Sequence, residues 1–147
     1  MIGDGEKKSE IVARIKEKEL EDKIILVGSK SNTEDYYQAM DCFVFPSLWE
    51  GLGIAALEAQ AAGLKCIVSE RVPKEVDIGC GLVDVVNLSD DLSVWSKTII
   101  GAFNYERKNC IWHVKNAGYD VEDNANMLEQ FYIESYEAAM KQKEIKR

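Results

Sequence analysis

Two glutamates, Glu50 and Glu58, flank a short glycine-containing segment that leads into an alanine-rich stretch. A carboxylate accepts hydrogen bonds from hydroxyl groups, and each such charge-assisted bond contributes about 1.5–3 kcal/mol. Gly51 and Gly53 lack side chains, so a ligand can approach the backbone closely there and a positive φ is allowed. The pattern predicts a site for a molecule with hydroxyl-rich groups on either side of an anionic centre.

The anionic centre would lie at the start of a helix that we predict over residues 55–62 and that ends at Gly63, a typical residue after a helix. The unpaired N–H groups of a first helical turn, together with the helix dipole, attract anions such as a diphosphate. Glu50 and Glu58 would then bind the sugar and the ribose of a sugar nucleotide. A capping loop with two solvated glutamates explains these residues equally well, because glycine before a helix is common.

Short apolar runs alternate with helical patterns along the chain. Strands are predicted over 23–27, 42–45, 65–69 and 82–86, and helices over 6–19, 33–40, 55–62, 91–103 and 121–141. The first three apolar runs are nearly continuous, which is typical of strands covered on both faces. We therefore predict an α/β fold, a Rossmann-like doubly wound parallel sheet with helices on both faces. Ligands of such sheets bind at the carboxyl ends of the strands, where the loop with Glu50 lies.

The beginning of the sequence is unusual for this fold. Met1 and Ile2 read as the tail of a strand, and Gly3-Asp4-Gly5-Glu6 reads as the turn after it. We infer that a preceding strand and helix are missing, so that the fold is truncated at its N-terminus. Residues 1–147 are predicted to form a single truncated nucleotide-sugar-binding domain, with 120–147 as a long C-terminal helix.

Composition narrows the class of protein. The chain has 147 residues, of which 46% are hydrophobic and 30% charged, as expected for one globular domain. A net charge of -8 argues against nucleic acid and anionic membranes as partners of this domain. The four cysteines, none in CxxC spacing, predict reduced, buried thiols in a cytoplasmic protein. His113 is the only histidine, and we interpret it as structural because no partner for a triad or metal site is visible.

With these residues in view, the chain resembles the C-terminal, donor-nucleotide-binding domain of family 4 glycosyltransferases, which have the two-domain GT-B architecture. The subset it most resembles makes capsular polysaccharide or exopolysaccharide. The matching segments are Glu-x7-Glu from Glu50 to Glu58, its flanks 40–47 and 59–63, Gly3-Asp4-Gly5, Val27-Gly28 and Gly118-Tyr119-Asp120.

The resemblance implies a role for each site residue. Glu50, the catalytic residue, would contact the donor sugar near the reacting carbon, and the N–H groups of residues 51–55 would hold the sugar and the diphosphate. Glu58 would bind the ribose, and residues 28–30 would border the base. The donor-binding residues are thus Gly28, Ser29, Lys30, Gly51, Leu52, Gly53, Ile54, Ala55 and Glu58. The enzyme would be a retaining hexosyltransferase that uses a UDP-sugar without a bound metal.

The resemblance also shows what the sequence lacks. In the family, an Arg/Lys pair that stabilises the leaving diphosphate lies upstream of the Gly-Asp-Gly turn, and so does the acceptor-binding N-terminal domain. We therefore expect the isolated chain to be inactive. The full-length parent enzyme is expected to be cytoplasmic, and it could act at the inner face of the membrane. Two alternatives stay open: a non-catalytic docking module that forms a homodimer through an exposed sheet edge, and a sugar-nucleotide epimerase of the same architecture.

Overall fold

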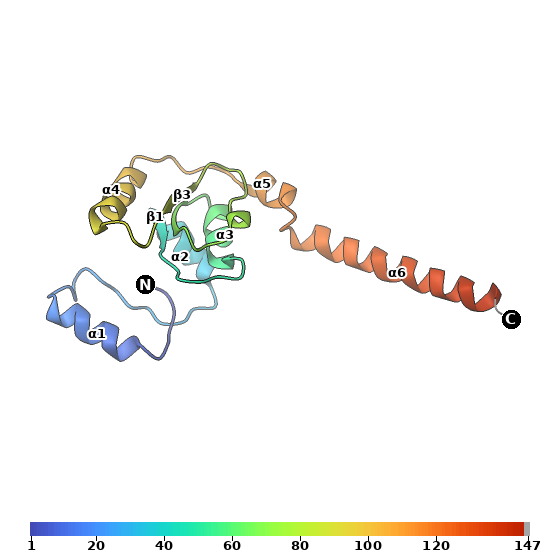
Figure 1. Cartoon of the computed structure of the whole chain (residues 1–147), viewed down its shortest axis with the longest axis horizontal. Helices are drawn as coiled ribbons and strands as arrows, with labels where there is room; N and C mark the ends of the chain where they lie inside the picture. Colours follow the sequence, from blue (N-terminus) through green and yellow to red (C-terminus); the bar gives the residue numbers. More distant parts are fainter. Residues whose placement is uncertain (146–147) are drawn as a thin grey trace. The chain divides into compact units, whose positions relative to one another are not determined.

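The computed structural model describes residues 1–145 and divides the chain into two compact units, Met1–Tyr36 and Tyr37–Arg147 (Figure 1). Each unit is described by itself below. The single domain over residues 1–147 stays a prediction. The last two residues of the predicted helix 120–147 lie outside the described residues.

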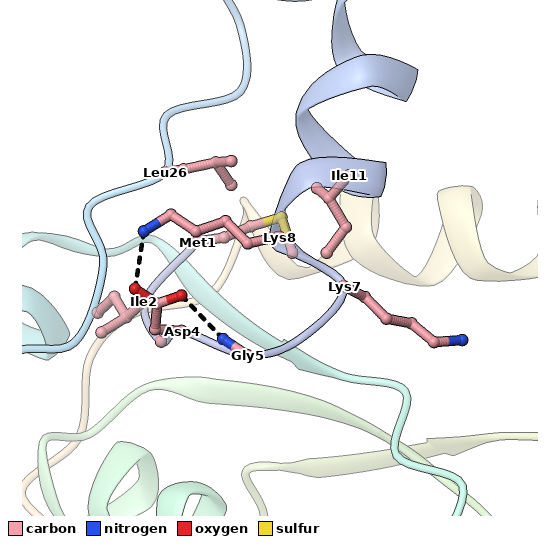
Figure 2. Close-up of a pocket in the computed structure, with 9 residues that line it drawn as sticks. Met1, Ile2, Asp4, Gly5, Lys7, Lys8, Ile11 and Leu26 are labelled. Carbon is pink, nitrogen blue, oxygen red and sulfur yellow. Dashed lines mark hydrogen bonds and ion pairs between the residues drawn. The ribbon is translucent and has the colours of Figure 1, made fainter.

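The first unit contains helix α1 (Lys8–Glu17), and helix α2 (Thr33–Ala39) begins in it. The Gly-Asp-Gly turn leads into α1 through Asp4, whose carboxylate accepts hydrogen bonds from the Gly5 N–H at 2.9 Å and from the Lys8 ammonium at 2.7 Å (Figure 2). The helices predicted over 6–19 and 33–40 are confirmed, and each is slightly shorter than predicted.

The strand predicted over 23–27 is wrong, because these residues form no regular strand. The segment is still paired with the first residues of the chain. The Met1 amino group donates to the carbonyl of Ile25 at 2.6 Å, and the Val27 N–H donates to the carbonyl of Met1 at 3.1 Å. A regular parallel ladder would next join Gly3 to Val27, but the Gly3 N–H donates to Gly28 instead, at 2.9 Å. The apolar run thus lies in an irregular pairing.

The second unit contains a three-stranded parallel sheet in the order β1-β2-β3. The strands are β1 (Cys42–Phe45), β2 (Lys65–Ser69) and β3 (Val83–Val86). The first two have the predicted bounds, and the third begins one residue later than predicted. β1 and β3 form the edges of this sheet, and the homodimer through a sheet edge stays a prediction.

Helices α3 (Ile54–Ala61) and α4 (Leu92–Ala102) cover opposite faces of the sheet (Figure 1). Side chains of β2 alternate between the faces: Cys66 packs in the core that contains α3, and Ile67 packs with Trp95 of α4. On α3, Ala56 and Ala59 are fully buried, and their small side chains let the helix approach the sheet closely. The predicted doubly wound arrangement is confirmed.

Three further helices complete the described residues. They are the 3-10 helix η1 (Lys74–Val76), α5 (Ile111–Asn116) and α6 (Val121–Ile145). The sequence did not predict η1 and α5, because segments of three and six residues are too short to show helical periodicity. Every side chain of α6 from 121 to 142 is exposed. Within residues 1–145, no helix is long and apolar enough to span a membrane.

Arg107 joins the ends of two helices in the second unit. Its guanidinium donates hydrogen bonds to the carbonyls of Tyr37 and Gln38 in α2, both at 3.0 Å, and to that of Met40 just beyond. It also donates to the carbonyl of Ala62, next to the end of α3, at 3.2 Å. Carbonyls in the last turn of a helix have no partner within the helix. The Arg107 side chain thus pairs carbonyls at the C-terminal ends of both α2 and α3.

The prediction that all four cysteines are reduced is wrong for two of them. Cys80 and Cys110 form a disulfide, with their Cα atoms 6.1 Å apart. They lie in a loop after η1 and at the start of α5, and a contact between segments 30 residues apart leaves no mark in local spacing. Cys42 and Cys66 are free as predicted, and burial raises the pKa of the Cys66 thiol to about 12.

Two glycines give opposite expectations for the same substitution. Gly63 has φ +77°, and a Cβ there would collide with the carbonyl oxygen of Lys108, whereas Gly101 lies in α4 with open space around it. Gly63→Ala should lower the free energy of unfolding by at least about 2 kcal/mol. Gly101→Ala should raise it by about 0.5–1 kcal/mol, since alanine favours the helix. Urea denaturation measures both, and equal effects would contradict this account.

Candidate functional site

The loop from 46 to 53 connects the carboxyl end of β1 to the amino end of α3. Gly53 precedes the helix with φ 86°, and its carbonyl accepts the Ala56 N–H at 2.8 Å. The positive φ favours glycine here, and a Cβ on Gly53 would lie 3.2 Å from Val72 Cγ1, close enough that the valine would have to shift slightly. The helix begins at Ile54, one residue earlier than predicted.

A row of backbone amides faces no protein acceptor at this helix end. Within residues 1–145, the N–H groups of Gly51, Leu52, Gly53, Ile54 and Ala55 donate no hydrogen bond to the protein. The dipole of α3 adds a partial positive charge at the same end. These amides are the ones that the sequence predicted, and their arrangement suits an anion.

Glu58 is oriented by a tyrosine from another element. The Tyr37 hydroxyl, from α2, donates a hydrogen bond to Glu58 Oε2 at 3.0 Å. Burial first, and then this hydrogen bond, raises the pKa of Tyr37 well above its ordinary value. Glu58 itself is exposed, and its Oε1 accepts no hydrogen bond within the described part of the chain. One carboxylate oxygen is therefore fixed while the other can accept from a ligand.

Glu50 is oriented by a serine. The Ser47 hydroxyl donates to Glu50 Oε1 at 2.7 Å, and the Ser47 carbonyl accepts a hydrogen bond from the hydroxyl of Ser69, the last residue of β2. Ser69 is fully buried and Glu50 is half-buried. The buried end of β2 thus holds the loop, and the loop holds the carboxylate near the carboxyl ends of the strands.

A pocket of about 330 Å³ lies beside Glu58. It is lined by Leu52, Ile54, Leu57, Glu58, Ala61, Ile78, Val114 and Tyr119. Glu58 is its one carboxylate, and the other lining residues are apolar apart from the Tyr119 hydroxyl. The pocket brings together three predicted donor residues, Leu52, Ile54 and Glu58, but Glu50 does not line it.

The remaining predicted donor residues, Gly28, Ser29 and Lys30, belong to the first unit. Gly28 has φ 71°, and Ser29 and Lys30 are exposed. Their place beside a nucleotide base stays a prediction.

Sequence reasoning missed the groups that orient the two carboxylates. Tyr37 packs edge-on against Phe43, with ring centroids 5.8 Å apart, and its hydrogen bond to Glu58 spans 21 residues and leaves no local signal. The pocket walls at Ile78 and Val114 were missed for the same reason. Ser47 lies three residues before Glu50, and a serine at that spacing was the one signal available.

Comparisons with known proteins identify relatives. The sequence model of the family described as "Glycosyl transferases group 1" matches residues 1–78. EpsF of Bacillus subtilis (strain 168), which is named as a glycosyltransferase, is 34% identical over 135 residues, which cover 90% of this chain and 35% of that protein. The UDP-Gal:alpha-D-GlcNAc-diphosphoundecaprenol alpha-1,3-galactosyltransferase of Escherichia coli is 30% identical over 143 residues, with 91% and 36% covered.

A solved structure is similar over the same extent. Sucrose-phosphate synthase from Thermosynechococcus elongatus superposes with a TM-score of 0.73 and 25% identity, covering 91% of this chain and 35% of that chain. This likeness confirms the α/β fold with a parallel sheet. The chain spans about a third of the length of these relatives.

Removing the hydroxyl of Tyr37 should have a pH-dependent effect. Tyr37→Phe should lower the free energy of unfolding by about 1 kcal/mol near neutral pH. Because the folded-state pKa is raised, the unfolded chain loses this proton first, near pH 10, and the stability from the hydroxyl falls as pH rises further. The difference between wild type and variant should therefore shrink above pH 10.

Urea denaturation at about pH 8 and about pH 11 measures this difference. Tyr36→Phe is the matched control, because within residues 1–145 the Tyr36 hydroxyl makes no hydrogen bond to the protein and its loss should change little at either pH. A difference for Tyr37→Phe that is the same at both pH values would contradict the account.

Proposed function

We propose that this chain, which belongs to the glycosyl transferases group 1 family, binds the nucleoside-diphosphate-sugar donor of a glycosyltransferase. The observation that supports this most is the row of unpaired amides at residues 51–55, with a hydroxyl-oriented carboxylate on each side. A sugar nucleotide has its groups in the matching order: the hydroxyls of the sugar, then the diphosphate, then the hydroxyls of the ribose.

Each group of the donor has a partner in this proposal. The diphosphate accepts hydrogen bonds from the amides before and within the first turn of α3. The ribose donates a hydroxyl hydrogen bond to the free oxygen of Glu58, whose other oxygen Tyr37 already holds. The sugar lies near Glu50, whose carboxylate accepts from its hydroxyls.

Transfer of the sugar breaks the bond between its anomeric carbon and the diphosphate oxygen and forms one to an acceptor hydroxyl, whose proton passes to the departing diphosphate. Negative charge grows on the departing diphosphate, and fixed amides next to it stabilise that charge without reorganisation. Glu50, near the reacting carbon, would be the catalytic residue of this chain. We propose retention of anomeric configuration, a hexosyl group and no metal at the donor site.

UDP is the proposed nucleotide. The name of the Escherichia coli relative says that it uses UDP-Gal, and that relative is 30% identical over 91% of this chain. A capsular or exopolysaccharide product and a cytoplasmic site of action complete the proposal.

Isothermal titration with UDP and with UDP-galactose tests the two carboxylates separately. Glu58→Gln keeps an acceptor for Tyr37 but removes the charge, so it should weaken binding of both ligands roughly 10- to 100-fold. Glu50→Gln should leave UDP binding unchanged and remove the extra affinity that the sugar provides.

The control for this titration is Glu129→Gln, an exposed glutamate on α6, which should bind both ligands like wild type. If Glu58→Gln binds UDP as tightly as wild type, the ribose does not contact Glu58. If wild type binds neither ligand at millimolar concentration, the proposed donor site is wrong for this chain.

The chain by itself should transfer no sugar. It spans 35% of EpsF and 36% of the Escherichia coli enzyme, and the family resemblance assigns acceptor binding and the diphosphate-stabilising Arg/Lys pair to the part it does not match. Incubation with UDP-galactose and a panel of lipid-diphosphate and sugar acceptors should release no UDP above the uncatalysed background. Turnover by the purified chain would contradict this expectation.

A further inference from the structure

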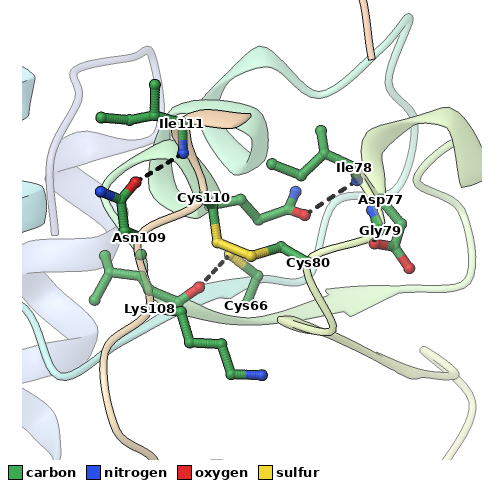
Figure 3. Close-up of a disulfide and its surroundings, with 12 residues drawn as sticks. Cys66, Asp77, Ile78, Gly79, Cys80, Lys108, Asn109, Cys110 and Ile111 are labelled. Atoms are coloured by element: carbon green, nitrogen blue, oxygen red, sulfur yellow. Dashed lines mark hydrogen bonds between the residues drawn. A yellow bond between two sulfur atoms is a disulfide. The ribbon is translucent and has the colours of Figure 1, made fainter. Parts of the chain in front are cut away.

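Three side chains that could bind a metal ion lie together and include none of the residues assigned to the donor site. The ligand atoms of Cys80, Cys110 and His113 all lie within 4.8 Å of one another. Both cysteines are buried, and their sulfurs meet in a disulfide (Figure 3). Cys110 directly precedes α5 and His113 follows three residues later, a spacing that places both side chains on one side of a helix.

The loop around Cys80 is shaped to turn its sulfur inward. Gly79 and Gly81 flank the cysteine with φ 76° and 71°, conformations that favour glycine. The Asp77 carboxylate accepts the Gly79 N–H at 2.9 Å and braces the turn. The backbone conformation of this loop, in addition to the disulfide, thus sets the position of Cys80.

His113 adds an independent observation. Its Nδ1 is buried and has no hydrogen-bond partner within residues 1–145. A buried polar nitrogen without a partner is unfavourable by about 1–3 kcal/mol, so its retention calls for an explanation. A disulfide offers the ring no strong hydrogen bond, whereas a metal ion held by the same sulfurs would bind an imidazole nitrogen directly.

We propose that Cys80 and Cys110, in the reduced state, form with His113 a binding site for Zn²⁺. Two thiolates and one imidazole are a donor set that zinc prefers. On a tetrahedral zinc, two sulfurs would be about 3.8 Å apart and a sulfur and a nitrogen about 3.6 Å apart, given ordinary bond lengths. Once the disulfide is reduced, its sulfurs separate to about van der Waals contact, which is close to this spacing. A water molecule completes the coordination.

The disulfide state converts to the zinc-bound state by reduction followed by metal binding. A dithiol reductant transfers two electrons to the Cys80–Cys110 bond, becomes a disulfide itself and leaves two thiols on the protein. Zn²⁺ then displaces one proton from each thiol, while the imidazole binds as the neutral base. Two thiolates neutralise the charge of the ion, so the buried site carries no net charge.

The site would hold the pocket beside Glu58 in either state. Cys80 lies two residues after Ile78, and Cys110 lies four residues before Val114, and both of these apolar residues line that pocket. A disulfide or a zinc ion each joins the same two pocket walls. The proposal therefore gives the fold a structural link that is maintained under oxidising and reducing conditions, and it does not depend on the donor that the pocket accepts.

Titration of the reduced, metal-free chain with Co²⁺ tests the proposal, because cobalt replaces zinc and its bonds to thiolates absorb in the near ultraviolet. Wild type should develop this absorption at one equivalent of Co²⁺ and lose it when Zn²⁺ is added. Cys80→Ser and Cys110→Ser should lose the absorption, and His113→Ala should weaken Co²⁺ binding at least about 10-fold. Cys42→Ser, a control on a free, half-buried cysteine of β1, should behave like wild type.

Far-ultraviolet circular dichroism before and after Zn²⁺ addition keeps the test decisive if reduction unfolds the chain. Zinc should then restore the helical signal in wild type and in Cys42→Ser, but not in Cys80→Ser. No absorption and no recovery in reduced wild type would overturn the proposal. Binding that His113→Ala leaves unchanged, or that Cys42→Ser abolishes, would overturn it as well.

Discussion

The buried amide of Gln60 is the interaction on which the candidate site most depends. It is fully buried on α3, where its Nε2 donates to the carbonyls of Ala56 at 3.0 Å and Val76 at 2.7 Å, while its Oε1 accepts the Ile78 N–H at 3.3 Å. These bonds fasten the η1 segment to the helix. Val76 then packs near Gly53, and Ile78 becomes a wall of the pocket. A polar side chain so deep in the core is favourable because both ends of its amide are paired.

The carboxylates of Glu50 and Glu58 are oriented in the same way. Each is held by a neutral hydroxyl, Tyr37 for Glu58 and Ser47 for Glu50, rather than by a lysine or an arginine. A cation would satisfy a carboxylate more strongly and would compete with a ligand for it. A hydroxyl fixes one oxygen and leaves the negative charge available to attract further hydroxyl donors. Both donors are anchored in the fold, since Tyr37 is buried and the Ser47 carbonyl is bonded to buried Ser69.

The sequence predicted the elements whose signals are local. The strands over 42–45 and 65–69 are continuous apolar runs, and glycine at Gly53 and Gly63 marks both ends of α3. The run over 23–27 is also a continuous apolar run. Whether it forms a regular strand depends on the segment that pairs with it, and the run itself carries no information about that segment. The Tyr37–Glu58 hydrogen bond and the disulfide join residues 21 and 30 positions apart, so they follow from the packed core and not from local spacing.

Arg107 has a consequence for how the chain acquires this structure. The guanidinium lies 70 residues after Tyr37, and it follows the last strand, which ends at Val86. Domains fold as units while synthesis proceeds from the N-terminus. On the ribosome, all three strands emerge from the exit tunnel before this side chain does. The hydrogen bonds from this guanidinium to the ends of α2 and α3 therefore form only after the whole sheet has been synthesised.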